Sequence, residues 1–135
     1  MGYKITEIEG IGPAYAEKLE ACGITTSDQY LDKCADRKGR DEIAEKTGIS
    51  SKLILRWANQ ADLMRISGVG EEYAELLEAA GVDTVKELKM RRADNLTAKM
   101  AEVNETKKLV RQTPSESVVT KWIEQAKEME PRISH

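Results

Sequence analysis

The feature that most constrains this 135-residue chain is an internal repeat. Residues 8–26 and 66–84 align without a gap at an offset of 58 positions, and 11 of the 19 aligned residues are identical. Trp57 and Trp122 continue the correspondence at an offset of 65, so the second copy contains seven extra residues, which are most easily placed near 102–112. Because self-similarity of this length indicates duplication, we expect two structural units of the same type.

The repeat also predicts where the units begin and end. The first unit is expected at 1–61 and the second at 62–129, with the insertion inside the second. No stretch rich in proline, glycine or serine separates them, so the last helix of the first unit should lead directly into the second. Residues 130–135 are expected to form a frayed tail without an assignable role.

Each copy predicts short helices joined by glycine turns. The sequences Gly-x-Gly at 10–12 and 68–70 permit positive φ and close backbone approach between helices. Pro13 suits the first turn of the helix that follows, where the missing N–H costs little. Gly23 and Gly81 are well placed to end that helix in each copy.

The remaining helices are predicted from their capping residues. Thr26 and Thr84 begin capping boxes, in which the threonine hydroxyl and a residue three positions later satisfy each other's amides. A helix is expected near 41–47, and Ser50 and Ser115 are expected to cap the final helix of each copy. Because no segment alternates with period two over the length of a strand, we expect an all-α protein.

The tyrosines, tryptophans and cysteines of the repeat are interpreted first as structural residues. The large aromatic residues recur at matching helical positions in the two copies and are expected in or beside the core: Tyr15, Tyr73, Trp57 and Trp122. The two cysteines are expected to be small core residues, since Cys22 aligns with Ala80.

Composition argues against an enzyme. The single histidine is His135, so a serine or cysteine nucleophile would lack a histidine base. Cys22 and Cys34 form no CxxC pair, and the glycine-rich loops that bind nucleotides are missing. We therefore expect a non-enzymatic protein with no cofactor and no bound metal. Two cysteines are too few for a disulfide framework, and no apolar run approaches the roughly 20 residues of a membrane span. These features predict a cytoplasmic protein without a membrane partner.

The segment Ile8–Leu19, with its order of short helix, hydrophobic-Gly-hydrophobic-Gly and a helix bearing Ala16 and Leu19, resembles the helix-hairpin-helix motif. The two copies together resemble tandem helix-hairpin-helix domains over about 3–129, which implies two packed units of the five-helix, SAM-like type. The stretch Asn95–Arg111 is similar to an uncharacterised prokaryotic family, a domain of unknown function built on this fold.

This resemblance implies binding to DNA without regard to sequence, with the hairpin amides meeting a backbone phosphate as helix N-termini receive anions. A basic side chain in the helix after the hairpin normally helps, and Lys18 is the candidate in the first copy. The matching hairpin positions are Gly10, Ile11 and Gly12 in the first copy, and Gly68, Val69 and Gly70 in the second.

The charge pattern departs from that family. Residues 62–85 have a net charge of −5, and Glu71 and Glu72 directly follow the second hairpin, where they should repel phosphate. Residues 86–111 have a net charge of +4, which is either an ordinary solvated face or a contact surface for phosphate or an acidic partner. The candidate basic contacts in this segment are Arg91, Arg92, Lys99, Lys107, Lys108 and Arg111.

Two functions remain open from the sequence. One is a module that binds nucleic acid, DNA or RNA, through its backbone, although a pI near 5.4 is low for such a domain. The other is a protein-interaction or assembly module that has lost phosphate binding. In that case the adjoining acidic and basic segments could also pair between molecules and favour self-association.

Overall fold

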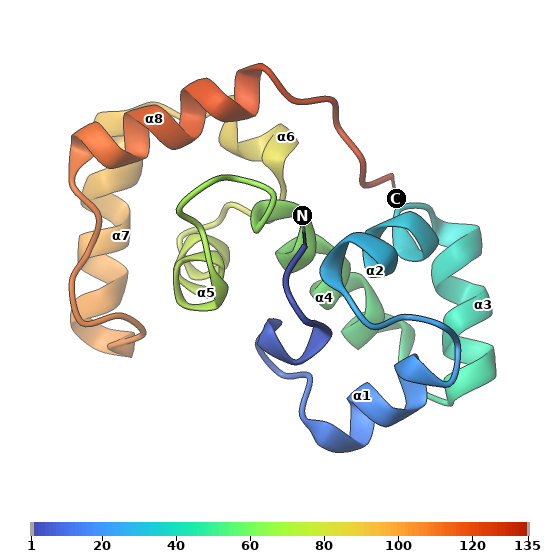
Figure 1. Cartoon of the computed structure of the whole chain (residues 1–135). Coiled ribbons are helices and arrows are strands. Elements are labelled where there is room, and N and C mark those ends of the chain that lie inside the picture. Colours follow the sequence, from blue (N-terminus) through green and yellow to red (C-terminus); the bar gives the residue numbers. More distant parts are fainter. Residues whose placement is uncertain (1, 135) are drawn as a thin grey trace. The chain divides into compact units, whose positions relative to one another are not determined.

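The computed structural model describes residues 2–134, and within that range every regular element is helical (Figure 1). The predicted all-α class is confirmed. The chain divides into two compact units, one comprising the residues up to Asp62 together with the tail from Arg132, the other comprising Leu63–Pro131. Each unit is described by itself below.

The first unit contains a short 3₁₀-helix and four α-helices: η1 (Ile5–Glu7), α1 (Pro13–Glu20), α2 (Ser27–Cys34), α3 (Arg37–Thr47) and α4 (Ser51–Leu63). The second contains four α-helices, in which α8 packs against α6 and α7, and α7 packs against α5: α5 (Glu71–Ala79), α6 (Val85–Leu88), α7 (Ala93–Lys107) and α8 (Glu116–Lys127).

The glycine turn before α1 and the turn before α5 have nearly the same backbone. Gly10 has a φ of +94° and Gly68 a φ of +93°, a region that glycine adopts without strain. Gly12 and Gly70 are extended and form the N-caps of α1 and α5. Pro13 is the first residue of α1, as its position in the sequence predicts.

Both of these helices end in the same way. The amide of Gly23 donates to Glu20, and the next amide donates to Leu19, while φ at Gly23 is +81°. Gly81 has a φ of +96° and the equivalent pair of bonds. This pattern is the Schellman motif, which confirms the predicted C′ role of both glycines.

The predicted N-cap residues of the other helices are present, but of the capping box predicted at Thr84 only the bond to the threonine hydroxyl forms among the described residues. Thr26 and Gln29 form a full capping box before α2, with both hydrogen bonds at 3.2 Å, and Thr84 Oγ1 accepts from the Glu87 amide before α6 at 3.4 Å. Ser115 caps α8. The helix expected near 41–47 begins earlier, at Arg37, because the carboxylate of Asp36 accepts from the Gly39 amide at 2.8 Å.

In each unit a half-buried tyrosine and an exposed hairpin glycine lie against a buried tryptophan. Trp57 is 1% exposed, and its indole lies 5.1 Å from the ring centre of Tyr15. A Cβ on Gly10 would come within 3.0 Å of its Nε1. In the second unit the ring centres of Tyr73 and Trp122 are 5.3 Å apart. The predicted core and part-core aromatics are therefore confirmed, and a side chain at Gly10 would collide with one of them.

The chain beyond Arg132 differs from the expectation of a frayed tail. Arg132 forms an ion pair with Asp32 at 2.8 Å, and the Ser134 amide donates to the carbonyl of Ala35 at 2.9 Å. The guanidinium of Arg40, in turn, donates to the Ser134 carbonyl at 2.6 Å. The expectation was wrong because local composition does not reveal that Asp32, the carbonyl of Ala35 and the guanidinium of Arg40 offer partners to this segment.

Candidate nucleic-acid interface

The first hairpin presents open backbone donors. Ile11 is buried, and its amide donates to Ile8 within the turn at 3.1 Å, whereas Gly10 and Gly12 are exposed. Gly12 has no side chain with which to cap α1, and the first turn of α1 contains no acidic residue. Among the described residues none accepts a hydrogen bond from the amide of Ala14, so this helix start leaves a donor free for an anion.

The second hairpin has the same shape and the opposite chemistry. Val69 is buried and its amide donates to Ile66 at 3.0 Å, as in the first unit. Gly70 likewise provides no side-chain cap, but Glu71 and Glu72 occupy the first turn of α5. Carboxylates there complement the positive end of the helix dipole and repel a phosphate.

The structure does not bring Lys18 to the first hairpin. Lys18 is exposed and lies in the last turn of α1, at the end opposite to Gly12. Two acidic neighbours, Glu17 and Glu20, are exposed beside it. This lysine therefore contributes little positive potential at the open amides.

The basic segment of the second unit is split into two groups. Arg91 and Arg92 directly precede α7, whereas Lys107 and Lys108 end it, and a 15-residue helix is roughly 22 Å long. Arg111 lies in the loop beyond, exposed. The segment therefore does not form one continuous basic surface along α7.

Two of these cations are already paired with acidic residues. Arg92 contacts Asp94 at 3.1 Å, and the amide of Asn95 together with that guanidinium lowers the pKa of the Asp94 carboxyl. Lys99 lies 3.9 Å from Glu102. A groove of about 480 Å³ beside Arg91 and Arg92 is also lined by acidic side chains, Asp94, Glu116 and Glu124. The candidate cations without such a pair among the described residues are Arg91, Lys107, Lys108 and Arg111, and of these only Arg91 lies beside that acidic groove.

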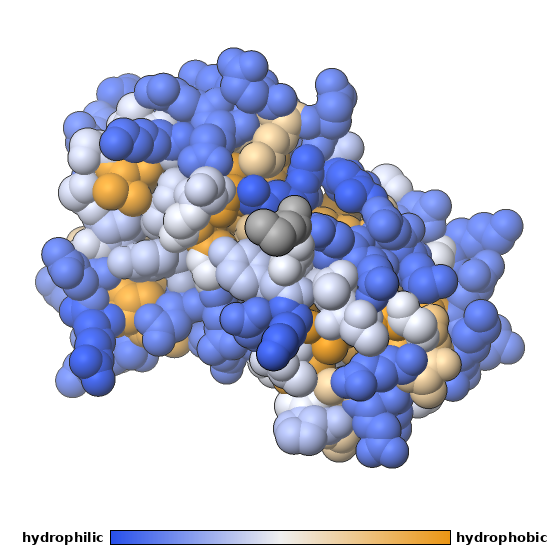
Figure 2. Space-filling view, in the orientation of Figure 1, coloured by the Kyte–Doolittle hydropathy of each residue, from blue (hydrophilic) through white to orange (hydrophobic). Residues whose placement is uncertain are grey.

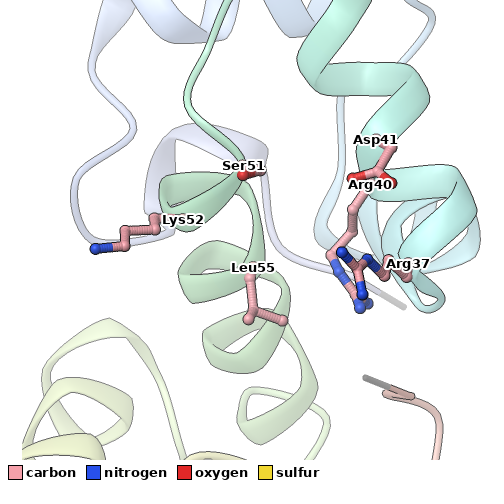
Figure 3. A pocket seen from close by; sticks show the side chains of 6 residues that line it. All are labelled: Arg37, Arg40, Asp41, Ser51, Lys52 and Leu55. Atoms are coloured by element: carbon pink, nitrogen blue, oxygen red, sulfur yellow. The ribbon is translucent and has the colours of Figure 1, made fainter.

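Sequence reasoning overlooked a basic cavity in the first unit. It measures about 260 Å³ and lies between α3 and the start of α4 (Figure 3). The residues that line it are Arg37, Arg40, Asp41, Ser51, Lys52 and Leu55. The available signal was the pair of arginines spaced i, i+3, a separation that places both on one face of a helix.

The buried cysteine and tyrosine of α2 are structural. Burial raises the pKa of the Cys34 thiol to about 11, so the thiol is protonated near neutral pH and is not a nucleophile. Burial also raises the pKa of Tyr30, whose hydroxyl donates to the Ile54 carbonyl at 2.7 Å. Cys22 is half-buried and unpaired.

Other kinds of site are not apparent in the described part of the chain. Residues 2–134 contain no cluster of three potential metal ligands and no helix with the length and apolarity to cross a membrane. The face shown in Figure 2 is mostly hydrophilic, with apolar side chains in small separate groups. Met90 is the most exposed large apolar residue described, at 78%.

Comparison with known proteins identifies a family without assigning an activity. Neither the curated proteins nor the solved structures give a significant match. One family model, described as a domain of unknown function (DUF4332), matches residues 9–129. That match includes both glycine hairpins and both tryptophan-bearing helices. The chain thus belongs to the DUF4332 family.

Proposed function

We propose that each unit is a helix-hairpin-helix module and that this non-enzymatic protein binds the backbone of nucleic acid in the cytoplasm without reading base sequence. The resemblance of Ile8–Leu19 to the motif, together with the matching turns at Gly10 and Gly68, supports the module assignment. The two unpaired cysteines are in keeping with a reducing compartment.

The first hairpin is the main contact in this proposal, and the observation that most favours it is the open first turn of α1. That turn has a free amide at Ala14 and no acidic residue, so a phosphate oxygen can accept hydrogen bonds at the positive end of the helix. The unpaired cations Lys107, Lys108 and Arg111 would add contacts of the counterion-releasing kind.

The test exploits the alignment of Ala14 with Glu72. Ala14→Glu gives the first hairpin the acidic turn of the second, and it should lower the affinity for a labelled duplex about fivefold, because about 1 kcal/mol of helix-dipole attraction is lost. A glutamate near a helix N-terminus favours the helix, so unfolding does not explain the loss. The matched control is Ala21→Glu, which adds the same charge to an exposed position at the other end of α1.

Fluorescence anisotropy at low salt measures the binding. We expect the affinity to fall with salt at a slope corresponding to only a few phosphates. Lys107→Glu combined with Lys108→Glu should weaken binding further than the control pair Lys121→Glu and Lys127→Glu, two exposed lysines of α8. If no binding appears up to about 100 µM protein, the weak end of ordinary non-specific affinities, nucleic-acid binding is excluded.

The acidic turn of α5 favours a second candidate, a protein-interaction or assembly module. Glu71 and Glu72 disfavour phosphate at the second hairpin, and the excess of acidic residues over 62–85 favours a basic partner or the +4 segment of a second copy. Light scattering at low and high salt would reveal self-association, which should weaken as salt screens the charges. A pull-down would identify a different partner.

A further inference from the structure

The cavity between α3 and α4 is lined by residues of the first unit alone, and none of them belongs to a glycine hairpin. Figure 3 shows its two ends. The guanidinium groups of Arg37 and Arg40 gather toward one end, across from Leu55 on α4, whereas Asp41 and Ser51 lie toward the other. The cavity is therefore cationic at one end and has hydroxyl and carboxylate groups at the other.

Arg40 is the central residue of the cationic end. It is only 5% exposed, and the carbonyl oxygens of Cys34, Ala35 and Ser134 hold its guanidinium at 3.1, 2.9 and 2.6 Å. These acceptors are neutral, and no described carboxylate forms an ion pair with Arg40 or with Arg37. A buried positive charge without a counter-charge is costly, and an anion in the adjoining cavity would relieve that cost.

The start of α4 adds to the attraction for an anion. The first turn of α4 contains Lys52 and no acidic residue. Because Ser51 and Lys52 line the cavity, the positive end of this helix dipole lies at the cavity wall. In Figure 3 the Lys52 amine extends away from the two guanidinium groups, and we therefore assign it a weaker role.

We propose that this cavity binds a small phosphate monoester whose organic part carries hydroxyl groups. Arg37 and Arg40 would hold the phosphate through charge-assisted hydrogen bonds, for which the guanidinium fork is well suited. Asp41 would accept a hydrogen bond from a ligand hydroxyl, and Ser51 would donate or accept one. A volume of about 260 Å³ lies just below the roughly 300–1,000 Å³ of pockets for drug-sized ligands, which fits a small compound.

The experiment is an NMR titration of the ¹⁵N-labelled full chain with glycerol 3-phosphate, inorganic phosphate and glycerol. We expect glycerol 3-phosphate to bind most tightly, inorganic phosphate more weakly and glycerol not at all, with the largest shifts at the Arg37 side chain and the Ser51 amide. Absence of saturable shifts with glycerol 3-phosphate up to about 10 mM, where affinity is negligible, would overturn the proposal.

Three variants separate the roles of the lining residues. Arg37→Gln should weaken binding about tenfold or more, the usual loss for a charged hydrogen bond. Lys38→Gln is the matched control, because Lys38 is exposed on the same helix and does not line the cavity. Equal losses in these two variants would indicate general charge attraction and contradict the site.

Asp41→Asn addresses the hydroxyl end. This variant should bind glycerol 3-phosphate more weakly and bind inorganic phosphate equally well or slightly more tightly. If the unaltered protein binds the two ligands with equal affinity, the hydroxyl contact is contradicted. Arg40→Lys tests the role of the buried charge. If this variant lowers the thermal midpoint of unfolding, the binding measured for Arg37→Gln still decides whether the site exists. None of these residues belongs to either hairpin, so duplex binding and this site succeed or fail independently.

Discussion

The two hairpins have nearly the same backbone and opposite surface chemistry. Gly10 and Gly68 differ in φ by one degree, and each lies against the tryptophan of its own unit. The helix after the first turn begins with Pro13 and Ala14, whereas the helix after the second begins with two glutamates. The two copies therefore share the residues that make the turn and pack beneath it, and they differ in the first turn of the helix that follows.

The tryptophans should give the largest effects if the two cores are equivalent. Trp57→Ala and Trp122→Ala should each cost roughly 3–5 kcal/mol of unfolding free energy, since both indoles are at most 2% exposed. Urea denaturation followed by circular dichroism measures both. A loss below about 1 kcal/mol in one variant would show that the two units do not share the same core.

The turn glycines should cost less, and unequally. Gly10→Ala should cost about 1–3 kcal/mol because of the positive φ, and more than Gly68→Ala, since the nearest indole nitrogen is 3.0 Å from the new Cβ in the first unit and 3.3 Å in the second. Valine in place of either glycine should cost at least as much.

Gly12→Ala is the control for the turn glycines: it is extended, and no atom lies within 4 Å of its added Cβ. Equal losses at Gly10 and Gly12 in thermal melts would refute this account of the turn.

The ends of α3 and α7 sharpen the comparison further. Both have a left-handed C-cap, but α3 uses Gly48 with a φ of +75° and α7 uses Lys108 with a φ of +50°. Lys108→Gly should stabilise the protein by about 0.5–1 kcal/mol. This gain is the strain of the left-handed backbone that is relieved, minus the larger conformational entropy that glycine loses on folding. Gly48→Ala should destabilise it by a similar amount. Thermal denaturation tests both, and a destabilising Lys108→Gly would contradict the strain.

The smallest effect at neutral pH is expected at Cys34. This residue aligns with Arg92, so the second unit has no thiol at the corresponding position. The pKa of the Cys34 thiol in the folded protein, about 11, is higher than that of an ordinary thiol. The folded state is therefore stabilised by the neutral thiol at any pH below the ordinary thiol pKa, and this stabilisation is lost as the pH rises toward 11. We expect the free energy of unfolding to fall over this range, and to fall less in Cys34→Ala. Identical pH profiles for the two proteins would show that this thiol is not linked to folding.

Local sequence patterns predicted much of the fold. The Schellman glycines, the threonine and serine caps and the paired aromatics depend on residues within a few positions of one another, or on the repeat, and all are present. α3 begins before the predicted start near 41, because the Asp36 carboxylate caps it.

Less of the candidate site could be predicted. The residue types at the hairpins indicated phosphate contact, and the acidic second turn was evident from Glu71 and Glu72. The net charge of 86–111 suggested one basic surface, but α7 places Arg91 and Lys107 at opposite ends, and Arg92 pairs with Asp94. Net charge counts residues without their positions, so it does not distinguish a dispersed set from a patch.

By itself the sequence determined the all-helical class, the two copies and the glycine turns, because helix periodicity, capping and positive φ are properties of neighbouring residues. Only the tertiary structure decided that Ser134 would reach Arg40 and that Arg37 and Arg40 would face Leu55 across a cavity. Such contacts depend on how whole helices and the C-terminal segment pack against one another, and packing is set by the summed fit of many side chains that no single pattern encodes.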